Sequence, residues 1–153
     1  MKSPRTPILL LGMCFAAAAQ AQFRKPEDSI RYRQGVMEVM DFHLYRQVGS
    51  MINGRIPFDA KAASRSAGLV ATMSSLPWPA FLPGTDSGKS DKTDAKPAIW
   101  SEPAKFKDLS DKMQAQVVKL QAAADAGDLE ALKVAYRATS NACKACHDAF
   151  TTQ

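Results

Sequence analysis

The sequence has few cysteines and histidines, and it has no long hydrophobic run after its first 21 residues. Among 153 residues there are three cysteines and two histidines. No segment after residue 21 is long and apolar enough for a transmembrane helix. The formal net charge is +5, but lysine and arginine are scattered and are not interleaved with aromatic residues as on a nucleic-acid-binding surface. We therefore expect neither membrane insertion nor nucleic-acid binding.

Groups typical of an enzyme active site are also missing. The sequence contains no evident carboxylate pair, nucleophile–base pair or phosphate-binding loop. It also lacks the alternating pattern of β-strands and any internal repeat. We therefore expect a helical protein that is not an enzyme.

The first 21 residues have the pattern of a secretory signal peptide. Lys2 and Arg5 precede an apolar run that ends in Ala19-Gln20-Ala21. That run is shorter than the roughly 20 residues needed to span a bilayer. We predict cleavage after Ala21 and export to the periplasm. The remaining residues, 22–153, are enough for one domain with one hydrophobic core.

Four segments of the predicted mature chain have apolar residues at spacings of three and four, which is typical of amphipathic helices. The segments are about 29–53, 60–75, 104–125 and 129–150, and the second and fourth have Asp59 and Asp128 as predicted N-caps. A stretch rich in proline and glycine, Pro77–Pro103, separates the second helix from the third. The predicted fold is an all-α, up-and-down four-helix bundle with a long loop between helices 2 and 3. The predicted inward-facing residues are Ile30, Met37, Met40, Leu44, Val48, Met51, Ala63, Ala67, Val70, Met73, Phe106, Leu109, Met113, Val117, Leu120, Ala124, Leu132, Ala135, Thr139, Cys143, Cys146 and Phe150.

The fourth helix contains Cys143-Lys144-Ala145-Cys146-His147, which is the attachment motif of c-type haem. Two thiols three residues apart can add to the two vinyl groups of one porphyrin, while the adjoining imidazole reaches the iron. All three side chains fall on one face of a helix. The motif predicts one covalently attached haem c per subunit, bound by Cys143 and Cys146, with His147 as axial iron ligand.

Two other readings of this cysteine pair fit the sequence less well. A redox-active disulfide of the thioredoxin type needs a strand-to-helix context, and no strand is predicted. A zinc site needs further ligands, and His43 is the only other histidine in the sequence. His43 lies off the apolar seam, so we predict a solvated or boundary position for it. A haem-free thiol switch stays as a remote alternative.

Six further segments resemble cytochrome c′, the class II c-type cytochrome of the proteobacterial periplasm. They follow the family order, and the resemblance covers essentially all of residues 22–150. The segments are Gln22-Phe23-Arg24-Lys25-Pro26-Glu27-Asp28, Tyr32-Arg33-Gln34, Leu76-Pro77-Trp78, Phe81-Leu82-Pro83-Gly84-Thr85, Lys96-Pro97-Ala98-Ile99-Trp100-Ser101 and Ala124-Asp125-Ala126-Gly127-Asp128-Leu129.

The resemblance implies roles for four more residues. Arg33 and Gln34, on the first helix, would lie against the haem and its propionates. Met37 would cover the distal face of the iron, and Asp94 would lie near the haem edge. Relatives commonly carry an arginine near the proximal haem face, four residues after the histidine ligand. This sequence has Thr151 there, so the resemblance does not extend to proximal gas chemistry.

The function implied by the resemblance depends on the sixth position of the iron. A high-spin, five-coordinate haem would bind neutral diatomic gases such as NO and CO, transfer single electrons with an unidentified redox partner, or do both. The alternative is a low-spin, six-coordinate electron carrier with Met37 as the sixth ligand. The family habit of pairing through the first two helices implies a homodimer, with Val36, Phe42 and Ile56 as candidate outward apolar residues.

Overall fold

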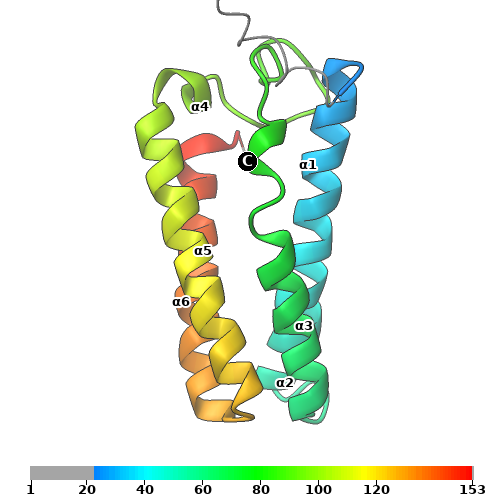
Figure 1. Ribbon diagram of the computed structural model, residues 1–153, viewed down its shortest axis with the longest axis vertical. Helices are drawn as coiled ribbons and strands as arrows, with labels where there is room; N and C mark the ends of the chain where they lie inside the picture. The colour runs from blue at the N-terminus through cyan, green and yellow to red at the C-terminus, as the bar shows by residue number, and fades with distance from the viewer. Residues whose placement is uncertain (1–22, 153) are drawn as a thin grey trace, which may run out of the picture.

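The protein is a bundle of four long helical segments that run side by side (Figure 1). The computed structural model describes residues 23–152, so the predicted signal peptide lies outside the described residues. Two short turns lie at one end of the bundle and a long crossover lies at the other (Figure 1). This is the predicted up-and-down arrangement. The helical elements are α1 (Pro26–Asp41), the π-helix η1 (Phe42–Val48), α2 (Gly49–Ile52), α3 (Ala60–Met73), the 3₁₀ helix η2 (Trp78–Ala80), α4 (Ala98–Ser101), α5 (Pro103–Asp125) and α6 (Leu129–Phe150).

The first long helical segment consists of α1, η1 and α2 without a break, where one helix was predicted. Pro26 stands in its first turn, where the missing N–H costs no helical hydrogen bond, and Glu27 and Asp28 complement the helix dipole there. The π-helical turns in η1 were not predicted. The segment ends beside Gly54, whose φ of 68° lies in the left-handed region that glycine adopts without strain.

Both predicted aspartate caps are present. The Asp59 carboxylate accepts a hydrogen bond from Ala62 N at the start of α3, at 2.9 Å. The Asp128 carboxylate accepts from Glu130 N and Ala131 N at the start of α6, at 2.9 and 3.0 Å. Each cap supplies an acceptor for amides that have no partner within the helix.

The predicted inward-facing residues form the core, with one correction. Val36, expected to face outward, is only 8% exposed and packs in the core. Val36, Met40, Leu44 and Val48 follow one another at intervals of four, so the buried stripe of this segment runs along its i, i+4 row and includes Val36. Six of the predicted core residues are only partly buried. Five of them, Met37, Phe106, Leu109, Cys143 and Cys146, line a cavity, and the sixth, Met73, packs against the core from outside.

The long crossover packs onto the bundle through its aromatic residues. Trp78 Nε1 donates to Ser74 O at 2.7 Å, and Trp100 Nε1 donates to Phe81 O at 3.1 Å. The Phe81 and Phe106 rings meet edge to face, with centroids 4.9 Å apart. The crossover is therefore an ordered cover at one end of the bundle.

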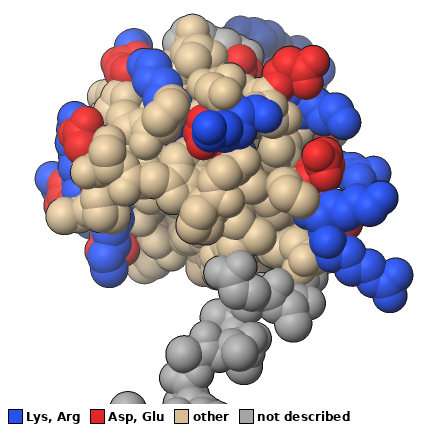
Figure 2. Space-filling view, turned by 90° about the horizontal axis from the view of Figure 1, so that it is seen from above, with Lys and Arg blue, Asp and Glu red and all other residues tan. Residues whose placement is uncertain are grey.

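Charged side chains of both signs are mixed on the surface. In the end-on view of Figure 2, most lysines and arginines lie along the periphery with aspartates and glutamates among them. On the long helices, pairs such as Lys112–Asp108 and Lys144–Asp148 join residues four apart. Basic and acidic side chains are therefore intermixed on the face that Figure 2 shows. Within residues 23–152, no helix has the length and apolarity needed to cross a membrane.

Candidate haem site

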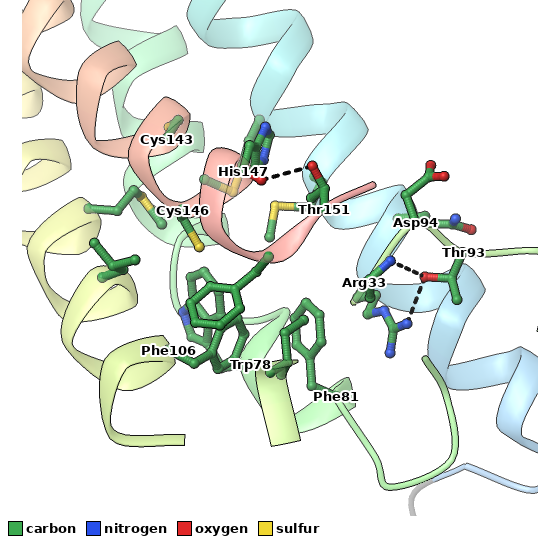
Figure 3. Close-up of a pocket in the computed structure, with 18 residues that line it drawn as sticks. Arg33, Trp78, Phe81, Thr93, Asp94, Phe106, Cys143, Cys146, His147 and Thr151 are labelled. Carbon is green, nitrogen blue, oxygen red and sulfur yellow. Dashed lines mark hydrogen bonds between the residues drawn. The ribbon is translucent and has the colours of Figure 1, made fainter. Parts of the chain in front are cut away.

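The cysteines and the histidine of the motif lie near the end of α6, which carries them as a rigid unit. Cys143 and Cys146 are free thiols and are partly buried, whereas His147 is exposed. Figure 3 shows all three along one edge of a cavity at the crossover end of the bundle. The spacing that predicted a shared helix face is therefore realised.

This cavity encloses about 250 Å³ and is lined mainly by apolar side chains. α1 contributes Met37 and Met40, and α5 contributes Phe106, Leu109 and Met113. All seven residues predicted for the site line the same cavity. They are Arg33, Gln34, Met37, Asp94, Cys143, Cys146 and His147.

An aromatic cluster forms the wall of the cavity beside the crossover. Phe106 contacts Trp78 and Phe150 edge to face, with ring centroids 5.7 and 5.3 Å apart. Trp78 also stacks on Phe81. Phe106 and Phe150 were predicted as core residues, and their place in the lining of the site was not predicted. For Phe150 the signal was its position four residues after Cys146 on the same helix face, whereas no local signal identified Phe106.

Arg33 lies at the edge of the cavity and is only 3% exposed. Its Nη1 donates to Thr85 Oγ1 at 2.7 Å and to Ala80 O at 3.2 Å. Its Nη2 donates to Thr85 O at 2.6 Å and to Thr93 Oγ1 at 2.9 Å. The guanidinium also lies 4.5 Å from the centre of the Phe81 ring. Arg33 therefore binds the crossover to α1, a role that was not predicted from the sequence.

Burial lowers the pKa of Arg33 from its ordinary 12.5 to about 10. The side chain therefore stays charged at neutral pH. Because it also lies at the cavity edge, it puts a positive charge beside any group bound there. Such a charge favours an anionic substituent at this edge, such as a carboxylate.

Three polar residues from different parts of the chain also line the cavity. They are Gln34 on α1, Asp94 in the crossover and Thr151 directly after α6. Gln34 Nε2 donates to Lys92 O at 2.8 Å. The Asp94 carboxylate accepts from Thr152 Oγ1 at 3.0 Å. The Thr151 hydroxyl donates to His147 O at 2.9 Å, so the edge of the cavity beside His147 carries a neutral hydroxyl at this position.

The environment of the two thiols argues against a thiol switch. Burial, and then repulsion from a Cys146 thiolate, raises the pKa of Cys143 to about 11. Burial also raises the pKa of Cys146. Redox-sensing cysteines have lowered pKa values and accessible thiolates, which is the opposite condition.

His43 lies outside the cavity. Its Nδ1 is 3.3 Å from Ser66 Oγ on α3, and its side chain is partly buried. This agrees with the predicted boundary position. Within residues 23–152, no group of three or more histidine, cysteine, aspartate or glutamate side chains is arranged to hold a metal ion.

The residues present fit one haem. Two thiols and an adjoining imidazole lie on one edge of an apolar cavity, which suits two vinyl attachments and one iron ligand. Aromatic and methionine side chains supply apolar surface for a flat macrocycle, and Arg33 supplies a positive charge at the edge.

Comparison with known proteins agrees with this fit. Residues 28–151 match the cytochrome c′ family. The chain is 49% identical over 129 residues to cytochrome c′ of Rubrivivax gelatinosus, which covers 84% of this chain and 98% of that protein. It is 32% identical over 149 residues to cytochrome c-554 of Cereibacter sphaeroides, which covers 94% of this chain and 96% of that protein.

A solved structure is also similar. It is the nitric oxide complex of a leucine-to-alanine variant of cytochrome c′ from Alcaligenes xylosoxidans, with a TM-score of 0.78 and 42% identity. The match covers 86% of this chain and 99% of that chain. The sequence match, the four-helix fold and the cavity together show that this chain belongs to the cytochrome c′ family, whose members carry covalently attached haem c.

Proposed function

We propose that the protein is a periplasmic cytochrome c′ with a five-coordinate, high-spin iron that binds neutral diatomic gases such as NO and CO, passes single electrons, or does both. One haem c would be attached through Cys143 and Cys146, with His147 as axial ligand. The observation that carries the proposal is the apolar cavity that holds these three residues together with Met37. We propose no catalysed reaction.

A haem held by Cys143, Cys146 and His147 would supply an iron able to bind a small ligand. The chain supplies selectivity. Met37 and Met40 add apolar surface to the α1 side of the cavity, which also carries Arg33 and Gln34, and contact with this apolar surface penalises anionic ligands that would lose their hydration. Neutral diatomic molecules lose little hydration on entry. The nitric oxide complex of the structural relative supports gas binding as the function of this cavity.

A six-coordinate electron carrier is the second candidate. Met37 lines the cavity, and its thioether is a known axial ligand of c-type haem. Cytochrome c-554 is among the relatives at 32% identity. We favour the covering role for Met37, because the 49% identical relative is a cytochrome c′.

The optical and resonance Raman spectra of the ferric and ferrous protein test the proposal, because they report coordination number and spin state directly. We expect five-coordinate, high-spin iron in both states. A low-spin ferric spectrum with a sulfur-to-iron charge-transfer band would establish the Met37-ligated carrier instead. A colourless protein, or haem removed by acid-acetone, would reject covalent attachment.

The periplasmic location is tested by expressing the chain without residues 1–21. Maturation of c-type haem requires reduced thiols and haem outside the cytoplasm, so this truncated chain should accumulate mostly without haem. The full chain serves as the control. Abundant covalent haem in the truncated chain would contradict export-dependent maturation.

A further inference from the structure

Residues 92–96 cross one edge of the cavity and connect α1 to the end of α6. We call this segment the strap. On the α1 side, Arg33 Nη2 donates to Thr93 Oγ1 at 2.9 Å, and Gln34 Nε2 donates to Lys92 O at 2.8 Å. Thr93 Oγ1 also accepts from Ala95 N at 3.2 Å, which fixes the turn of the strap.

The other end of the strap is bound to the residues that follow His147. Lys96 N donates to Phe150 O at 2.9 Å, and Thr152 N donates to Asp94 O at 3.0 Å. The Thr152 hydroxyl also donates to the Asp94 carboxylate at 3.0 Å. A single antiparallel bridge joins Ala95 to Thr151. The end of α6 and the strap are therefore one hydrogen-bonded unit.

The strap forms part of the cavity wall. Thr93, Asp94 and Ala95 line the cavity, as does Thr151 on the α6 side. Figure 3 shows Thr93 and Asp94 with Arg33 on the same side of the cavity as Thr151. A displacement of the strap would therefore widen the cavity between α1 and α6.

The side-chain contacts at the two ends of the strap differ in burial, whereas the backbone bonds at the α6 end include the buried residues Ala95 and Phe150. Arg33 is 3% exposed and Thr93 is 8% exposed, so their hydrogen bond is shielded from water. Asp94 and Thr152 are both exposed, so water competes for the bond between their side chains. Local opening occurs where few buried contacts and mostly exposed hydrogen bonds hold a segment. Opening of the strap should therefore start at the exposed Asp94–Thr152 contact and then involve the backbone bonds of Lys96 and Thr152, while the buried Arg33–Thr93 bond holds.

We propose that the strap is a hinged gate of the haem cavity, with Arg33 as its fixed anchor and the Asp94–Thr152 contact as its latch. Opening of the latch admits small neutral ligands through the edge between α1 and α6. Thr152 is thus a positioning residue, because it acts on ligand entry through Asp94 and touches no ligand itself. The gate rests on the proposed function, since it controls access for a gas ligand.

The test compares Thr152→Val with Thr72→Val in the haem-loaded protein. Valine keeps the size of threonine and the backbone N–H, so Thr152→Val removes only the hydroxyl contact to Asp94. Thr72 is the matched control, because its hydroxyl makes an exposed bond to Gly68 O on α3, outside the cavity lining. Hydrogen–deuterium exchange of the Lys96 and Thr152 amides reports latch opening, and flash photolysis reports CO association.

We expect Thr152→Val to speed exchange of both amides about fivefold, which equals about 1 kcal/mol at 1.4 kcal/mol per tenfold. CO association should accelerate by a similar factor of about five, since entry follows the open population. Thr72→Val should change neither rate. Unchanged exchange would reject the latch, and faster exchange with unchanged CO association would reject the gate.

A wild type that binds no CO tests the proposed function separately from the gate. If the wild type binds no CO because Met37 ligates the iron, the proposed five-coordinate function fails. The gate is then judged by amide exchange and by CO association measured in a Met37→Ala background. Equal association rates with and without Thr152→Val in that background would overturn the gate.

Discussion

Met37 distinguishes the two candidate functions. If its side chain only covers the iron, Met37→Ala removes packing that an incoming ligand must displace. CO affinity of the ferrous protein should then rise at least about tenfold, a change of about 1.4 kcal/mol, and the ferric spectrum should be high-spin before and after substitution. CO titration followed by absorbance measures this.

Met51→Ala is the control for this substitution. Met51 lies on the same long helical segment but is buried in the core and does not line the cavity. Its truncation should cost about 2–5 kcal/mol of unfolding free energy and leave CO affinity unchanged. A low-spin wild type that becomes high-spin on substitution of Met37 would assign the sulfur to the iron and leave the haem site intact.

Individual site residues were predictable to different degrees. Cys143, Cys146 and His147 could be identified as a site because covalent attachment fixes their spacing within one helix. The hydrogen bonds of Arg33 could not, because its partners lie 47–60 residues away along the chain. Local patterns carry no information on such long-range contacts. The roles assigned to Arg33, Gln34, Met37 and Asp94 toward haem stay predictions.

α6 depends on its N-terminal cap as well as on its apolar face. Asp128→Ala leaves the amides of Glu130 and Ala131 without their carboxylate partner. The expected loss is about 1 kcal/mol of unfolding free energy, measured by urea titration. The visible spectrum should not change, because the cap and the cysteines lie toward opposite ends of α6.

Asp111→Ala on α5 is the control for this substitution, because it also removes an aspartate carboxylate but no helix cap. It removes an exposed ion pair with Lys107 four residues away, which is worth no more than about 0.5 kcal/mol. If Asp128→Ala cost no more than Asp111→Ala, capping would not be what stabilises the start of α6.

The helices could be predicted because each buries one face at spacings of three and four, whereas their irregularities could not. The π-helix η1 keeps Leu44 and Val48 buried four residues apart, so its sequence pattern matches that of an α-helix. Val36 was predicted to face outward because its neighbour Met37 was predicted to face inward, whereas the buried stripe includes both positions in part. η2 and α4 were not predicted within the crossover, because proline-rich stretches carry no helical periodicity.

At the scale of the whole molecule, the bundle is packed differently at its two ends. Aliphatic residues such as Val48, Ala63 and Leu132 fill the end near the short turns. At the crossover end, the long helices leave the cavity lined by Met37, Phe106 and the cysteines. One end therefore supplies stability, and the other leaves space for a cofactor.

The outer face of the first helical segment carries apolar residues suited to a homodimer interface. Val39 and Phe42 lie three residues apart and are 38% and 45% exposed, and Ile56 beyond α2 is 41% exposed. Val36, first expected to contribute, is buried and does not. In a two-fold dimer the same face of each copy is used, so one substitution alters the interface twice.

Phe42→Asp places one carboxylate from each subunit in that interface and should raise the dimer dissociation constant at least about tenfold. Sedimentation velocity over a range of concentrations measures the change. Val118→Asp on α5 is the control, because Val118 is 66% exposed on a different helix and should not affect dimerisation. Equal weakening by both variants would place the interface elsewhere. A wild type that stays monomeric by light scattering at high concentration would remove the dimer altogether, and the exposed Phe42 would then be an isolated surface hydrophobe.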